Sequence, residues 1–191
     1  MTRALYLIGP PASGKSTVMA ETLNLMGLVT GEAYQPWPVK NTEFRAEPLL
    51  DIIDGHQRGV SLGVTRPGGF PGTDAIGMAA QPDAVGWVTE SDELPHLIVG
   101  EGMRLATYGF LAPLAVRSRL LVLYLNAPDE VLDARCEARG SNQKPQFRKT
   151  GATRARNLAA KLREHGVLVQ DCPTETMSVP EIAAEAAFHL A

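Results

Sequence analysis

The chain has little cysteine and no long apolar run, and both absences limit what it can be. Its 191 residues include two cysteines, Cys136 and Cys172, which have no partners at metal-ligand spacing and are too few for a disulfide framework. We expect both to be reduced thiols in a cytoplasmic protein. The apolar run at the N-terminus is too short for a signal peptide, and no run approaches the length that spans a membrane. We therefore expect no membrane partner.

The chain also lacks an excess of either charge. Its formal net charge is −3, which argues against a uniformly basic nucleic-acid binder but leaves room for a local basic patch. Hydrophobic residues make up 45% and charged residues 20%, as in ordinary globular proteins. This length suits one α/β domain, so we expect residues 1–191 to form a single domain.

What the chain does have is a phosphate-binding loop. Residues 9–17 match the pattern G-x-x-x-x-G-K-[ST], between an apolar strand at 4–8 and a helix at 18–26. Such a loop wraps a triphosphate in backbone N–H groups at a helix N-terminus. We expect the loop to bind ATP, with Lys15 on the β- and γ-phosphates and Ser16 on Mg²⁺. The ATP-binding residues in the loop are Gly9, Ala12, Ser13, Gly14, Lys15, Ser16 and Thr17. A glycine-rich turn without a ligand is the structural alternative.

Strands and helices alternate along the chain as a parallel sheet requires. We predict strands at 4–8, 60–65, 96–99, 120–125 and 167–169, and helices at 83–90, 103–116, 129–139, 152–165 and 180–190. Residues 27–59 are harder to interpret, apart from one possible helix at 49–53. The pattern predicts an α/β three-layer P-loop kinase fold, with a five-stranded parallel sheet, helices on both faces and a lid at about 140–151.

A P-loop alone does not distinguish a kinase from a GTPase or a motor ATPase. The guanine motif N-K-x-D is missing, since Asn126 is followed by Ala-Pro-Asp. The length leaves little room for a remodelling module. A small kinase is therefore favoured, with a nucleotide-dependent ATPase switch as the alternative.

The second informative segment is basic. Residues 139–163 contain no Asp or Glu and eight cations: Arg139, Lys144, Arg148, Lys149, Arg154, Arg156, Lys161 and Arg163. Arg135 and Arg139 are four apart on one helix face and could contact nucleotide phosphates or stack on adenine. A polyanionic substrate such as DNA could meet Arg148, Lys149, Arg154 and Arg156. Gln143 and Phe147 could touch a base, although Phe147 could instead anchor the loop. A solvated helix face is the structural alternative.

Two further segments resemble thymidylate kinases. Residues 64–69, Val-Thr-Arg-Pro-Gly-Gly, are similar to their T-R-E-P-G-G strand and loop without the Glu. Residues 123–131, running on to Arg135 and Arg139, resemble their fourth strand and the start of their lid. The chain departs from the family where Glu-Gly-Met-Arg at 101–104 replaces D-R-[YFH], and where the lid is basic rather than acidic.

A closer resemblance is to phage P-loop kinases that phosphorylate 5-hydroxymethyluridine within DNA. The similar segments are residues 72–75, 100–106 and 139–143. This resemblance implies an ATP-dependent kinase that acts on DNA in the host cytoplasm. A kinase of a free nucleoside or nucleoside monophosphate is the alternative, and the oligomeric state stays open.

Two acids follow predicted strands, at the sheet edge where ligands bind in this class. Glu101 could hold Mg²⁺ or accept the proton of the substrate hydroxyl, and Asp74 is the other candidate base. Arg104, one helical turn beyond Glu101, could grip a phosphate, and Arg66 could hold a substrate phosphate. The structural alternatives are a helix cap for Asp74 and a surface ion pair for Arg104.

Overall fold

The computed structural model describes residues 1–36, 44–65, 72–77, 79–141 and 143–191. These residues form one seven-stranded sheet in the order β2-β3-β4-β5-β1-β6-β7. The strands are β1 (Arg3–Ile8), β2 (Leu28–Thr30), β3 (Ala46–Asp51), β4 (Gln57–Leu62), β5 (Leu97–Glu101), β6 (Arg119–Asn126) and β7 (Leu168–Pro173). Neighbours from β4 to β7 are parallel, which confirms the five parallel strands predicted from the sequence. The remaining two strands, β2 and β3, are antiparallel additions at one edge.

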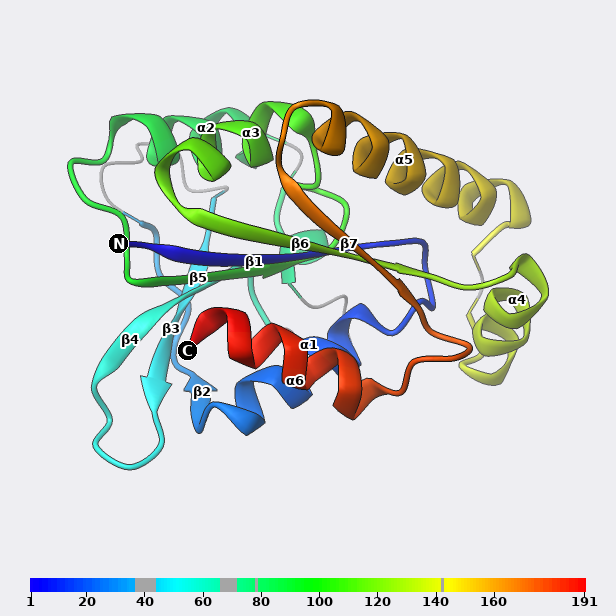
Figure 1. The fold of residues 1–191 in the computed structure, drawn as a ribbon, viewed down its shortest axis with the longest axis horizontal. Helices are drawn as coiled ribbons and strands as arrows, with labels where there is room; N and C mark the ends of the chain where they lie inside the picture. The colour runs from blue at the N-terminus through cyan, green and yellow to red at the C-terminus, as the bar shows by residue number, and fades with distance from the viewer. Residues whose placement is uncertain (37–43, 66–71, 78, 142) are drawn as a thin grey trace.

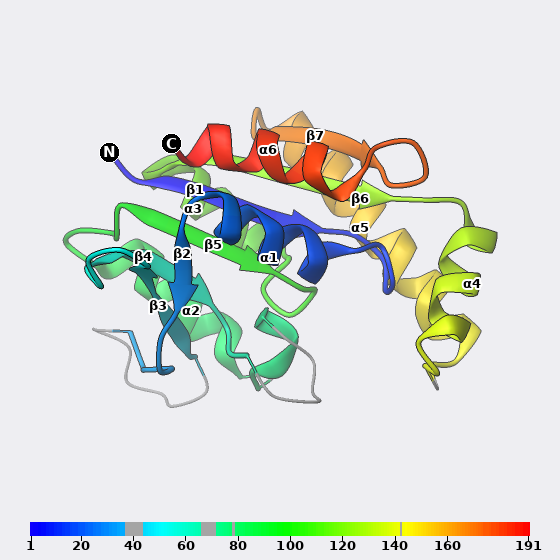
Figure 2. The ribbon, with the colours of Figure 1, turned by 90° about the horizontal axis from the view of Figure 1, so that it is seen from below.

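Helices cover both faces of the sheet, as predicted (Figure 1). One face carries α2 (Ala80–Glu90), α3 (Tyr108–Arg117) and α5 (Pro145–Glu164), and the other carries α1 (Lys15–Leu25) and α6 (Val179–Leu190). Figure 2, seen from below, shows α1 and α6 beside one another in front of the sheet. The short α4 (Asp129–Ala138) lies beyond one end of the strands, and a 3₁₀ turn, η1 (Gly72–Ala75), follows β4.

The three layers follow from the apolar sequence of the central strands. In β1, Ala4, Tyr6 and Ile8 pack into the core under α2, α3 and α5, while Leu5 and Leu7 pack into the core above α1 and α6. Because both faces of a strand are buried, the strand is a continuous apolar run rather than an alternating one. This is why β1, β5 and β6 could be recognised from sequence.

Several predicted boundaries were wrong. Residues 49–53 are not helical, because Ala46–Asp51 form β3 and pair with β4 through a tight connection. Arg58 on β4 forms ion pairs with Asp51 at the end of β3 and with Asp54 in the connection. The helix predicted at 103–116 begins only at Tyr108. The predicted loop at 140–151 is helical from Pro145, since proline is well suited to the first turn of a helix.

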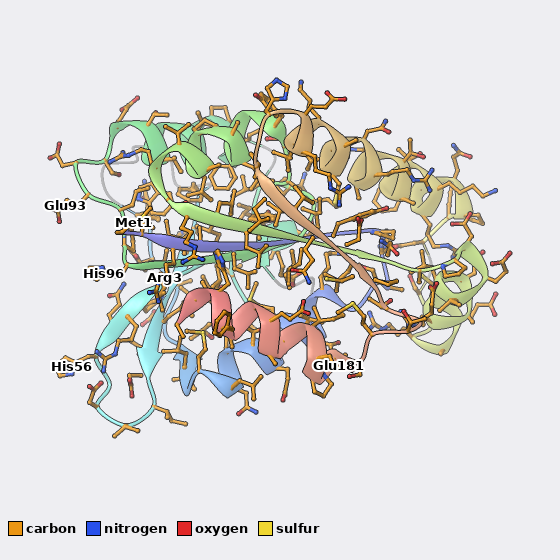
Figure 3. All side chains as sticks on the ribbon, viewed as in Figure 1. Met1, Arg3, His56, Glu93, His96 and Glu181 are labelled. Atoms are coloured by element: carbon orange, nitrogen blue, oxygen red, sulfur yellow. The ribbon has the colours of Figure 1, made fainter. Side chains whose placement is uncertain are left out.

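The carboxyl ends of the parallel strands meet at the end of the sheet nearest α4 (Figure 1). The phosphate loop follows β1 there, Glu101 ends β5, and η1 lies beside β5. Figure 3 places His56 and His96 at the opposite end, with Arg3 at the start of β1. Among the described residues no helix combines the length and apolarity needed to cross a membrane.

Candidate active site

The phosphate loop is shaped by close backbone packing. Gly9 has φ 155°, and a Cβ at this position would lie 2.3 Å from the carbonyl oxygen of Leu125 on β6. Only glycine fits so near a neighbouring strand. Lys15 opens α1, and its Nζ donates to the carbonyl oxygens of Gly9 (3.1 Å) and Pro10 (2.9 Å). The loop therefore curls around the lysine, beside the N-terminus of α1.

Glu101 faces this loop from the end of β5. Its side chain is buried, and its Oε1 accepts a hydrogen bond from the Ser16 hydroxyl at 2.7 Å. Burial raises the pKa of Glu101, against the opposing effects of the Ser16 hydrogen bond and the charge of Lys15. Burial has the opposite effect on Lys15 and lowers its pKa, while the charges of Glu101 and Asp74 act to raise it. A desolvated carboxylate and a desolvated ammonium thus share one site.

The Ser16 and Glu101 oxygens fit a magnesium ion. Mg²⁺ takes hard oxygen ligands and is held in kinases by one or two protein groups, with water and phosphate completing the shell. A hydroxyl and a buried carboxylate already in contact supply that donor set. Over the described part of the chain there is no cluster of three or more His, Cys, Asp or Glu that could hold a metal unaided.

The second acid is fixed by backbone hydrogen bonds. Asp74 lies in η1, and its Oδ1 accepts from the N–H groups of Met103 (2.8 Å) and Arg104 (3.2 Å). Gly102 has φ 103°, and a Cβ there would lie 2.9 Å from the Asp74 carboxyl carbon. These contacts join η1 to the segment after β5, so that Asp74 and Glu101 lie on the same side of the site.

One cleft of about 940 Å³ has the phosphate loop, η1 and the end of β5 as one wall and the helices α4 and α5 as the other. Its volume falls in the range of small-molecule and cofactor sites. It collects most of the residues that the sequence singled out: Ala12, Gly14, Lys15, Ser16, Thr17, Asp74, Glu101, Arg104, Arg139, Gln143 and Arg154. The charge of Arg139 also acts to lower the pKa of Lys15, after the larger effects of burial and the two acids.

Residues 1–171 match the family described as P-loop Nucleotide Kinase3. The chain belongs to this family of P-loop nucleotide kinases. It is therefore a nucleotide-binding kinase, an ATP-dependent phosphotransferase, and the match names no acceptor. Among solved structures it is similar to shikimate kinase from Acinetobacter baumannii in complex with shikimate, at 15% identity and a TM-score of 0.47, over 97% of this chain and 91% of that one. No curated protein matches it.

Several predicted site residues of this P-loop kinase lie outside the cleft. Arg135 donates to the Thr174 hydroxyl (2.8 Å) and carbonyl (2.9 Å), beyond the end of β7. Arg148 pairs with Asp133 on α4 at 2.8 Å. The remaining predicted cations, Lys149 and Arg156, are exposed on α5.

Gly9 and Ser13 belong to the phosphate loop but are buried beneath its cleft-facing surface. Arg66 lies outside the described residues.

The sequence interpretation missed two buried residues that position the acids. The hydroxyl of Tyr6 on β1 donates to the Gly102 carbonyl (3.1 Å) and lies 3.0 Å from the Thr73 hydroxyl, which donates to the Glu101 carbonyl (2.9 Å). Burial raises the pKa of Tyr6 well above its usual value, so the phenol stays protonated. Tyr6 was interpreted only as part of an apolar strand, because a polar tip on a core residue leaves no trace in the hydrophobic pattern.

A third missed residue, Glu47, supports the segment after β4. Its buried carboxylate on β3 accepts from the Thr65 backbone N–H (2.5 Å) and hydroxyl (3.0 Å). The Val64 N–H also donates to the Gly72 carbonyl (3.2 Å), so this segment is tied at both of its described ends. No sequence signal marked Glu47, because the pairing of β3 with β4 was not predicted.

Proposed function

We propose that this kinase transfers the γ-phosphoryl group of ATP to the 5-hydroxymethyl group of 5-hydroxymethyluridine in DNA. The observation that carries the phosphotransferase part is the contact of Glu101 with Ser16 beside Lys15, with Asp74 on the same wall. Phosphoryl transfer needs charge neutralisation and in-line positioning more than covalent help from the protein. This cluster supplies both in one cleft.

Each group in the cluster has a distinct task. Mg²⁺, when bound, neutralises charge on the phosphates, and Ser16 and Glu101 are the residues that would hold it. Lys15 balances the charge of the β- and γ-phosphates, and the first N–H groups of α1 hold the same anion. Lys15 must leave the carbonyls of Gly9 and Pro10 to reach a phosphate, which is a movement of the side chain alone.

Asp74 is the group that takes the proton of the acceptor hydroxyl. Its two backbone hydrogen bonds fix the carboxylate, and Asp74 lines the cleft that an acceptor hydroxyl would enter. Glu101, in contrast, is already committed to Ser16. The division of labour is therefore Glu101 for the metal and Asp74 for the proton.

Arg135 is suited to the adenine ring. Its two hydrogen bonds to Thr174 fix the orientation of the guanidinium beyond the carboxyl end of β7. A guanidinium is a planar cation that stacks on aromatic rings. The neighbouring turn of α4 carries Arg139 into the cleft, where the phosphates lie.

A polyanionic acceptor is supported by the charges on α5. Lys149 and Arg156 are seven residues apart, so they lie on one exposed face of this helix, and residues 139–163 include no carboxylate to offset them. The resemblance to phage DNA kinases supports hydroxymethyluridine as the modified base. A free nucleoside or nucleotide is the second candidate, because the cleft is also large enough for a small acceptor.

The direct test compares acceptors. Transfer of labelled γ-phosphate from ATP is measured with duplex DNA containing 5-hydroxymethyluridine, with the free nucleoside and with its monophosphate. We expect label in the DNA and little in the small acceptors. Label in the nucleoside or monophosphate alone would reject DNA as the substrate and leave the small-acceptor kinase.

DNA binding gives an independent test. The log of the binding constant should fall with the log of salt concentration by about 0.9 for each duplex phosphate contacted. A Lys149→Ala/Arg156→Ala double variant should have a slope shallower by about two units, at unchanged ATP affinity. Absence of DNA binding by the wild type at low salt would reject the DNA-kinase proposal.

A further inference from the structure

We infer that Phe147 is a stacking surface for a nucleobase inside the active-site cleft, an inference that rests on the proposed function. Phe147 lies in the first turn of α5 and lines the cleft. Its relative exposure is 61%, so much of the side chain is open to a ligand in the cleft. The sequence suggested either contact with a base or anchoring of the loop for Phe147. A side chain this exposed does not anchor the loop.

The spacing of α5 directs Phe147 into the cleft. Phe147, Gly151 and Arg154 are at positions i, i+4 and i+7, so they share one helix face, and all three line the cleft. The residues that α5 buries in the core begin only at Ala155. The first turns of this helix therefore serve the cleft and not the sheet.

Phe147 is held in a fixed place relative to the phosphate loop. A Cβ on Gly151 would lie 3.1 Å from Cδ of Pro11, so the helix touches the loop one turn beyond Phe147. The adjacent Arg148 is bound to Asp133 at 2.8 Å and donates to the Gln143 carbonyl at 3.1 Å. These contacts hold the backbone next to Phe147, so its ring lies in a fixed place relative to the phosphate loop.

The surroundings of this ring select a nucleobase over another apolar ligand. Arg154 lies two turns along the same face, and Arg139 faces the same cleft from the end of α4. An aromatic ring among cations is the arrangement with which proteins stack bases while neutralising the phosphates attached to them. Gln143, on the same side of the cleft, offers an amide that can donate to and accept from a base edge.

The nucleobase has two possible sources, the adenine of ATP and a base of the acceptor. The test measures equilibrium affinity for ATP and for a single-stranded oligonucleotide containing 5-hydroxymethyluridine, together with KM for each and kcat. Variants are Phe147→Ala, Phe147→Leu and Phe147→Tyr. Phe188→Ala is the matched control, because Phe188 on α6 is 85% exposed and lies outside the cleft.

We expect Phe147→Ala and Phe147→Leu to weaken binding of one ligand by about 10- to 100-fold, with kcat within about threefold of the wild type. Phe147→Tyr should bind like the wild type, and Phe188→Ala should change nothing. Weakened ATP binding assigns the base to adenine, and weakened oligonucleotide binding assigns it to the acceptor.

Two results would overturn the inference. One is affinity for both ligands within about twofold of the wild type in Phe147→Ala. The other is full rescue by Phe147→Leu, which would show that apolar volume and not stacking is what binds. The affinities are measured without turnover, so a wild type that does not phosphorylate 5-hydroxymethyluridine in DNA would reject the proposed function and still leave these two results to decide the role of Phe147.

Discussion

Replacing Glu101 by Gln removes one charge from the centre of the cleft and keeps its shape. The Gln side-chain oxygen can still accept the hydrogen bond that Ser16 donates at 2.7 Å. What is lost is the negative charge that would balance Mg²⁺ and that now acts to raise the pKa of Lys15. The substitution therefore separates electrostatics from packing.

We expect kcat to fall by about 10²-fold or more, which corresponds to about 2.7 kcal/mol of transition-state stabilisation. The Mg²⁺ concentration for half-maximal activity should rise in parallel. The free energy of unfolding should change by less than about 2 kcal/mol, because relief of carboxylate desolvation opposes the loss of a partner for Lys15. Without Glu101 the pKa of Lys15 should fall further, so the alkaline limb of the pH–rate profile should move to lower pH.

Steady-state kinetics over a Mg²⁺ series and a pH series measure these effects. Glu47→Gln is the matched control, since it removes another buried carboxylate, one that bonds Thr65 outside the cleft. That control should leave the Mg²⁺ dependence unchanged. A Glu101→Gln enzyme with normal kcat and normal Mg²⁺ dependence would refute the assignment of Glu101 to the metal.

Three further predictions concern other residues. Asp74→Asn should lower kcat by about 10²-fold with ATP affinity within about twofold, and near-normal kcat would show that the base lies elsewhere. Glu47→Gln should lower the free energy of unfolding by about 2 kcal/mol, because the Thr65 N–H and hydroxyl lose a buried charged acceptor, and an unchanged melting temperature would contradict this. Burial lowers the pKa of His189, so its contribution to stability is present above the unfolded-state value of about 6.5 and is lost as pH falls through the lower folded-state value. Thermal melts from pH 8 to pH 5 should show a smaller loss for His189→Gln, and equal losses would exclude this role.

The central strands and the phosphate loop could be predicted because their causes are local. A strand buried on both faces is an apolar run, and the loop motif can be recognised from its own residues. The packing of Gly9 against Leu125 on β6 is a long-range contact and was not predicted. The edge strands could not be predicted in this way. The three residues of β2 and the proline-containing β3 become strands only through antiparallel pairing, β2 with β3 and β3 with β4.

The roles of the individual cations in residues 139–163 could not be predicted from the sequence either. The sequence does not distinguish these cations from one another. In the structure, some of them are bound by residues from elsewhere in the chain, and others line the cleft. Asp133 binds Arg148, Asp171 binds Arg163 at 2.7 Å, and the ring of Tyr108 lies 4.4 Å from Nζ of Lys161.

Only part of the basic segment therefore faces the cleft, where Arg139 and Arg154 lie. Charge counting predicts that a patch exists. It does not predict which of its members face a ligand, because that depends on which carboxylates and rings the fold brings beside each one.

The most direct measurement is transfer of labelled phosphate from γ-labelled ATP to 5-hydroxymethyluridine DNA by the wild type and by Lys15→Ala. We expect Lys15 to contact the phosphates, and the Glu101–Ser16 hydrogen bond does not involve Lys15. We expect label in the DNA with the wild type and none above background with a folded Lys15→Ala protein. Equal transfer by the two proteins, or release of labelled inorganic phosphate alone by the wild type, would contradict it.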